Sequence, residues 1–201
     1  MEISDRPTLS RAEHHFAKAL LSLMDKKDYK KITVQELSEE AQFDRRTYYR
    51  YFTSKEDILE LYCSYILNDM AVMMQKKGPL TFRSGIVSYF AFWESHMDFL
   101  SLLEKNGMLH FLANHQDELL YYAVGKSVQP GIPVQLEDAS PFSRYSFYFI
   151  SGGLWNALVH WVKEKQRRTP EELTDYILTC FKEIDDRGSR SCGCAEGWKT
   201  G

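Results

Sequence analysis

The chain has 201 residues, of which 44% are hydrophobic and 26% are charged, an ordinary composition for a soluble globular protein of one domain or two small ones. No apolar run approaches the ~20 residues that a membrane span needs. The polar N-terminus shows no signal peptide, so we expect a cytoplasmic protein. Net charge is −3, yet residues 1–55 hold 11 Lys/Arg and 9 Asp/Glu (+2), and the remainder hold 14 and 19 (−5). This predicts a basic patch on an acidic body rather than a protein that coats nucleic acid.

The N-terminal part begins with a predicted helix. Ser10 and Glu13 have the spacing of a capping box, in which each side chain accepts from an unpaired backbone N–H at the helix start. Three apolar residues follow at helical spacing, Phe16, Leu20 and Leu23. We expect this helix to end near Asp25–Lys27.

Two shorter helices are predicted between residues 33 and 52. Thr33 and Glu36 form a second capping box, and Asp44 is a favourable N-cap for a helix over residues 45–50. The apolar residues of the first helix recur every three or four positions: Val34, Leu37 and Ala41. Two short helices with a tight turn near Gln42 are typical of a helix-turn-helix, whose second helix enters the DNA major groove.

The second of these helices carries side chains suited to DNA. Arg45, Arg46 and Thr47 lie at its start, where they can reach base edges; arginine can bond two acceptors of a guanine. Tyr49, Arg50 and Lys55 suit phosphates, which position a protein without reading sequence. The full set of predicted DNA contacts is Thr33, Arg45, Arg46, Thr47, Tyr49, Arg50 and Lys55.

The same stretch resembles the signature of the tetracycline-repressor-type (TetR/AcrR) regulators. The resemblance rests on Thr33-Val34, Glu36-Leu37, Ala41, the run Thr-Tyr-Tyr-Arg-Tyr-Phe from Thr47 and the run Ser-Lys-Glu-Asp-Ile-Leu from Ser54. It covers roughly positions 10 to 70 and implies a three-helix DNA-binding head. Two positions depart from the pattern: Gln42 stands where the family usually has glycine, and Ser38 where it usually has alanine. Gln42 is expected to adopt a left-handed backbone at a modest cost.

The remaining chain is predicted to be helical as well. Ser54 starts a long helix that Gly78-Pro79 ends, and it would connect the head to the body. Further helices are predicted over residues 81–99, 100–104, 108–126, 142–166 and 170–186, with a loop of about 14 residues before Phe142. The expected fold is all-α with about nine helices: a head at 1–53, a regulatory and dimerisation domain at 54–187, and a disordered tail at 188–201.

The helix over residues 142–166 is apolar on more than one face, so it should bury more than one side. Gly152-Gly153 lies within it and costs about 1 kcal/mol per glycine relative to alanine, which favours close approach of another helix or a ligand. The resemblance implies that the last two helices pair with those of a second subunit in a four-helix bundle. The predicted dimer interface consists of Leu154, Leu158, Trp161, Leu173, Ile177 and Phe181.

The resemblance also implies a small-molecule effector in the body, and the aromatic lining favours an apolar or aromatic one. The candidate pocket residues are Tyr89, Trp93, His96, Phe111, Tyr122, Phe147, Tyr148, Trp155 and Asn156. Each of these residues is individually more typical of ordinary core or interface.

No pattern in the chain favours an enzyme, a cofactor or a metal. No Glu stands three residues before any of the six histidines, so the di-iron pattern of helical bundles is missing. Glycine-rich phosphate loops and nucleophile elbows are missing too. Cys192 and Cys194 would need two more ligands to hold zinc, and none is near in sequence.

The sequence thus predicts a homodimeric transcriptional regulator, by family default a repressor, that binds a palindromic operator and is released by an effector. The alternative is an adaptor or co-activator of the same fold that acts through a protein partner, with DNA binding weakened by Gln42. A helical ligand-binding or metal enzyme is a third hypothesis without motif support.

Overall fold

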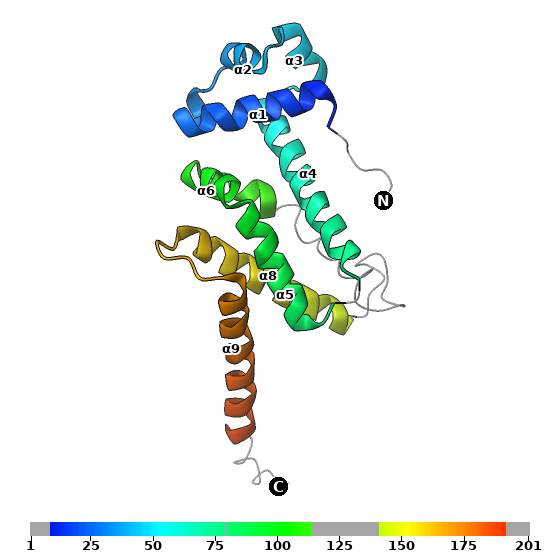
Figure 1. Ribbon diagram of the computed structural model, residues 1–201, viewed down its shortest axis with the longest axis vertical. Coiled ribbons are helices and arrows are strands. Elements are labelled where there is room, and N and C mark those ends of the chain that lie inside the picture. Colours follow the sequence, from blue (N-terminus) through cyan, green and yellow to red (C-terminus); the bar gives the residue numbers. More distant parts are fainter. Residues whose placement is uncertain (1–8, 79, 114–140, 192–201) are drawn as a thin grey trace, which may run out of the picture.

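A computed structural model of the chain describes residues 9–78, 80–113 and 141–191, and every regular element within them is helical, as predicted (Figure 1). The elements are α1 (Arg11–Lys26), the short 3-10 helix η1 (Tyr29–Lys31), α2 (Val34–Ala41), α3 (Arg45–Tyr51), α4 (Lys55–Lys76), α5 (Phe82–Ser95), α6 (Met97–Lys105), α8 (Pro141–Lys163) and α9 (Pro170–Ser191). None of the helices in these ranges is long and apolar enough to cross a membrane.

Helices α1 to α3 form a small head at one end of the molecule (Figure 1). The two predicted capping boxes are confirmed: Ser10 pairs with Glu13, and Thr33 pairs with Glu36. The head is closed by aromatic packing, since the ring of Phe16 lies 5.6 Å from that of Tyr48 and 5.8 Å from that of Phe52. All three are almost fully buried, so apolar burial holds α3 against α1.

Helix α4 runs from the head into the body, as predicted (Figure 1). Its N-cap Ser54 forms a capping box with Asp57. Residues of α4 join a hydrophobic cluster that is continuous from the head to α8. The helix ends before Gly78, whose φ of 74° suits glycine. A shift in the body can therefore reach the head through packed side chains.

The body departs from the prediction between α5 and α6. The break was expected near Phe99 but lies at His96, whose φ and ψ are −115° and 21°. The carbonyl of Phe92 accepts from the Ser95 hydroxyl at 2.6 Å and lies 2.9 Å from His96 Nδ1. Such side-chain bonds to a preceding carbonyl compete with the helix ladder, and they account for the earlier break.

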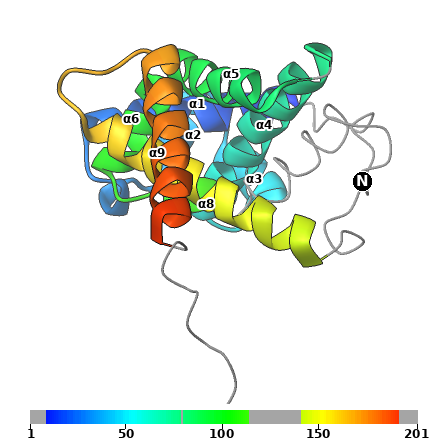
Figure 2. The same ribbon diagram turned by 90° about the horizontal axis from the view of Figure 1, so that it is seen from below.

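Helix α8 crosses the body beside α6, and α9 extends from the body on the side away from the head (Figures 1 and 2). Thr169 caps α9 as predicted, with its hydroxyl accepting from Glu172 N at 3.2 Å. Helix α9 packs on α5, and Arg83 and Asp175 form an ion pair between them. It continues to Ser191, so the first residues of the predicted tail are helical. The predicted loop before Phe142 and most of the helix predicted over 108–126 lie outside the described residues.

The head is also joined to the body by a second route, at the C-terminal end of α6. Asn106 accepts from Tyr29 N at 3.3 Å and donates to the carbonyl of Met24 at 3.4 Å. Lys105 donates to the carbonyl of Asp25 at 3.0 Å. These bonds fasten α6 to the corner between α1 and η1, which directly precedes α2.

Candidate nucleic-acid interface

The turn between α2 and α3 has the geometry that the sequence predicts. Gln42 has φ 59° and ψ 39°, a left-handed conformation, and its N–H bonds the end of α2. Phe43 N donates to the carbonyl of Ser38 at 3.0 Å. The non-glycine residue therefore closes the turn without altering it. The Ser38 hydroxyl is buried and has no hydrogen-bond partner within the described part of the chain.

Helix α3 is oriented by one buried tyrosine and one cap. Asp44 Oδ1 accepts from Thr47 N at 2.6 Å, and the hydroxyl of Thr47, together with this N–H, lowers the pKa of Asp44. Tyr48 is fully buried, and burial raises the pKa of Tyr48 to about 12, so the phenol stays neutral. With Tyr48 pointing into the head, the remaining side chains of this short helix point outward.

Those outward side chains include most of the predicted DNA contacts. Arg45, Arg46 and Arg50 are exposed, and Tyr49 is 63% exposed. The guanidinium of Arg50 lies 5.0 Å from the ring centroid of Tyr51, which leaves its N–H donors available. Thr47 is half-buried at the inner edge of this surface. The structure thus brings together the cationic residues that the sequence predicts at the front of α3.

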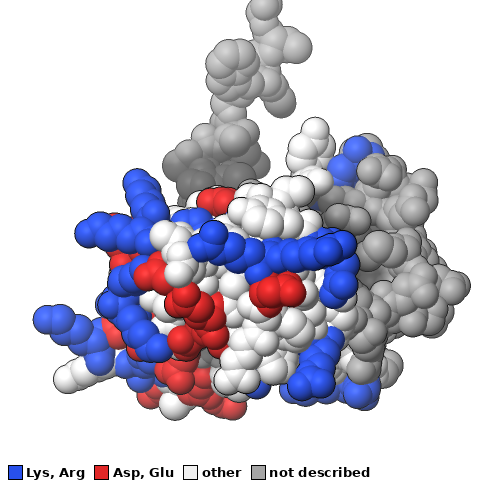
Figure 3. Space-filling view, turned by 90° about the horizontal axis from the view of Figure 1, so that it is seen from above, with Lys and Arg blue, Asp and Glu red and all other residues white. Residues whose placement is uncertain are grey.

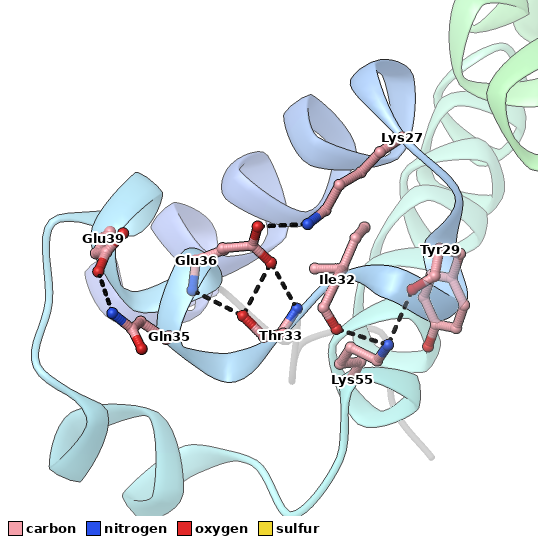
Figure 4. Close-up of polar contacts among 8 residues, drawn as sticks. All are labelled: Lys27, Tyr29, Ile32, Thr33, Gln35, Glu36, Glu39 and Lys55. Atoms are coloured by element: carbon pink, nitrogen blue, oxygen red, sulfur yellow. Dashed lines mark hydrogen bonds and ion pairs between the residues drawn. The ribbon is translucent and has the colours of Figure 1, made fainter.

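Thr33 lies at the start of α2, where it is exposed. Its hydroxyl donates to Glu36 Oε2 at 2.9 Å, and Glu36 also pairs with Lys27 (Figure 4). The bond to Lys27 and those to Thr33 lower the pKa of Glu36 to about 2, so the carboxylate is ionised at neutral pH. The cap therefore presents the N-terminus of α2, with Thr33, on the surface of the head.

Lys55 differs from the other predicted phosphate contacts. Its ammonium donates to the carbonyls of Tyr29 and Ile32, both at 2.9 Å (Figure 4). It also lies 4.6 Å from the ring centroid of Tyr29. Lys55 is half-buried, and two of its three donors are occupied inside the head. The structure therefore gives Lys55 a role in fastening α4 to η1.

The charges on this end of the molecule are mixed. Figure 3 looks onto the head and shows Lys and Arg side chains across the face, with Asp and Glu among them. The acidic side chains of α2 are partly paired: Glu40 accepts from Lys26 at 3.2 Å and from Ser22 at 2.7 Å. The exposed arginines of α3 are thus one part of a surface of mixed charge.

The predicted dimer residues divide between buried and exposed positions. Leu154, Leu158 and Trp161 are 8%, 1% and 1% exposed within a single protomer, so they belong to its core, and their contact with a partner stays a prediction. Leu173 and Ile177 are half-buried against the core, and Phe181 is 38% exposed. The exposed face of α8 instead carries Tyr145, Tyr148 and Phe149 at 74%, 46% and 70%. The sequence pattern could not decide between the two apolar faces of α8.

The predicted pocket residues lie at different depths in the described part of the body. Tyr89, Trp93 and Phe111 are buried, and His96, Phe147 and Trp155 are half-buried. Tyr148 and Asn156 are exposed on α8, and their place in a pocket wall stays a prediction. Tyr122 lies outside the described residues. Trp93 is fully buried, and its indole N–H has no hydrogen-bond partner in the part of the chain that is described.

A cleft of about 530 Å³ lies elsewhere, on the seam between α1 and α6. It contains none of the predicted pocket residues. Its wall combines apolar and charged side chains, from Leu21 and Asp25 on one helix and Asp98, Phe99, Ser101, Leu102 and Lys105 on the other.

These features define the class of the molecule: a helix-turn-helix head, with arginines on its second helix, on an all-helical body. Residues 17–62 match the family described as bacterial regulatory proteins, tetR family. A TetR transcriptional regulator from Streptococcus agalactiae 2603V is similar in structure, with a TM-score of 0.56 and 25% identity over 84% of this chain and 92% of that one. No protein of curated function matches. The chain thus carries the helix-turn-helix domain of the tetR family and has the fold of its transcriptional regulators.

Proposed function

We propose that the protein is a transcriptional repressor that binds a palindromic operator as a homodimer through α3. The observation that carries this proposal is the exposed group Arg45, Arg46 and Arg50 on a helix that Tyr48 anchors in the head. Arginines at the front of a recognition helix can bond guanine edges, and the cations behind them neutralise phosphates.

Selection of bound genomic fragments by the purified protein tests this directly. One recurrent palindrome is expected among the selected fragments. Arg46→Ala should lose discrimination at one base pair in each half-site, by roughly 5- to 150-fold per site. Arg50→Ala should weaken all sequences about equally and reduce the salt dependence of binding. If the wild-type protein selects no sequence, the proposal is wrong.

The exposed face of α8 supports the homodimer. Gly152 and Gly153 lie four residues beyond Tyr148 and Phe149, and a Cβ added at either glycine would meet no atom within 4 Å. Nothing in the described part of the protomer explains two glycines in mid-helix, whereas a second helix that packs there would. We infer that Tyr145, Phe149 and the glycine pair meet the same face of a second copy, which is the arrangement a two-fold axis requires.

Two charge substitutions on α8 separate this interface from the core. Phe149→Glu should give a folded monomer on size-exclusion chromatography with light scattering, because Phe149 is 70% exposed. Leu158→Glu should unfold the body, because it places a charge at a position that is 1% exposed. A Phe149→Glu protein that remains a dimer would place the interface elsewhere.

We further propose a small, largely apolar or aromatic effector that binds in the body beside Trp93, presents one hydrogen-bond acceptor to its indole N–H and lowers operator affinity. The buried indole N–H without a described partner supports this, because such donors are rare unless something else satisfies them. A ligand screen by thermal shift, repeated on Trp93→Phe, tests it: a ligand that stabilises both proteins equally does not use this donor.

The adaptor alternative rested on a turn weakened by Gln42. The left-handed conformation of Gln42 and the intact bonds around it remove that reason, so operator binding is the function that the geometry favours.

A further inference from the structure

We propose that Gln35, on α2, holds the guanidinium of Arg45 and thereby determines how strictly the protein reads the base that Arg45 meets. This inference rests on the proposed function, DNA reading by α3, and adds to it a positioning residue outside the recognition helix.

The geometry is a relay of three side chains on the surface of the head. Arg45 Nη2 donates to Gln35 Oε1 at 2.5 Å. Gln35 Nε2 donates to Glu39 Oε1 at 2.9 Å (Figure 4). Gln35 and Glu39 lie one turn apart on the same face of α2. The relay therefore reaches from the middle of α2 to the first residue of α3.

Glu39 fixes the direction of the relay. A glutamine amide has a carbonyl oxygen on one side and an NH2 group on the other, and it can present either to a neighbour. A carboxylate can only accept, so it takes the NH2 side of Gln35. The oxygen of Gln35 is then directed at Arg45, which can only donate.

The relay leaves Arg45 able to read DNA. A guanidinium has five N–H donors, and one bond to Gln35 leaves enough for a two-bond contact with guanine. Because the glutamine is neutral, it restricts the arginine without cancelling its charge. A long side chain that is already oriented loses less conformational freedom on binding and tolerates a wrong base less well.

Arg46 provides an internal comparison. It is the next residue of α3 and is also exposed, but the described residues give its side chain no hydrogen bond or ion pair. Gln35 should thus act on the base pair read by Arg45 and not on the one read by Arg46.

The test measures the affinity of the full-length protein for the selected operator and for every single-base-pair change in one half-site. The proteins compared are wild type, Gln35→Ala, Glu39→Ala, Arg45→Ala, Arg46→Ala and the double variants Gln35→Ala/Arg45→Ala and Gln35→Ala/Arg46→Ala. Thermal melting of each variant shows that the fold is retained.

Gln35→Ala is expected to reduce discrimination about 3- to 10-fold at the base pair that Arg45→Ala affects, and at no other. Glu39→Ala should do the same to a smaller extent. In the Arg45→Ala background Gln35→Ala should have no further effect, whereas in the Arg46→Ala background its full effect should remain. A merely structural role would weaken all operators alike.

Two results would overturn the inference alone: unchanged base preference in Gln35→Ala, or a change at a base pair that Arg45→Ala does not affect, since Gln35 would then read that base itself. Failure of the wild-type protein to select any DNA would instead overturn the proposed function, and the inference with it.

Discussion

Lys55→Ala distinguishes a lysine that contacts DNA from one that holds the head together. The sequence predicts a phosphate contact, and such a lysine would affect affinity and its salt dependence but leave stability within about 0.5 kcal/mol. The structure instead has the ammonium bonded to the carbonyls of Tyr29 and Ile32. We therefore expect the substitution to lower the free energy of unfolding.

The magnitude follows from the two bonds. A hydrogen bond to a charged group contributes about 1.5–3 kcal/mol. The site is half-buried, so water partly replaces the lysine and the lower end of that range applies to each bond. Lys55→Ala should then cost about 3 kcal/mol in total. For a chain of this size that corresponds to a fall of roughly 6 to 12 °C in melting temperature.

Urea unfolding followed by circular dichroism measures the effect. The control is Lys31→Ala, which removes an exposed lysine of η1 and should change stability by less than about 0.5 kcal/mol. Lys55→Met keeps the apolar stem and should be nearly as destabilised as Lys55→Ala. If Lys55→Ala is as stable as wild type while its DNA affinity and salt slope fall, the fastening role is wrong and the phosphate contact is right.

Three further outcomes follow from single positions. Gln42→Gly should raise stability by about 0.5–1 kcal/mol, because relief of left-handed strain outweighs the greater freedom of glycine in the unfolded chain; equal urea midpoints would refute this. The hydrogen bond from the Thr53 hydroxyl, followed by those from Ser54, lowers the pKa of Asp57 from 3.8 to about 2. The ionised carboxylate therefore stabilises the fold above pH ~4, and this contribution is lost as the pH falls toward 2. Asp57→Asn should flatten that part of a stability–pH profile. Burial raises the pKa of the Cys63 thiol, whereas Cys180 is exposed, so iodoacetamide at pH 8 should label Cys180 and spare Cys63 in peptide maps.

The features that sequence reasoning predicted correctly are those determined within a few residues. The capping pairs Ser10–Glu13 and Thr33–Glu36 join residues three apart, and the left-handed turn at Gln42 depends only on the helices on either side. Local hydrogen bonds of this kind leave a direct pattern in the sequence.

The features that were missed depend on partners far along the chain. Lys55 is 26 residues from the carbonyl of Tyr29, and Asn106 is 77 residues from its N–H. The choice between Leu158 and Phe149 as the outer face of α8 depends on where α5 and α6 lie, which periodicity along one helix cannot show.

Tyr29 is where these distant contacts converge. Its N–H is held by Asn106 at the end of α6, and its carbonyl is held by Lys55 at the start of α4. Hydrogen bonds from both α6 and α4 thus reach Tyr29, four positions before the Thr33 cap of α2. A displacement of α6 or α4 would strain a hydrogen bond to Tyr29 or move Tyr29 with it. Helix α2 would then move as well, because only Ile32 separates η1 from the Thr33 cap. Since α2 also carries Gln35, the orientation of Arg45 depends on the same corner, and this gives the body a physical means to alter how the head reads DNA.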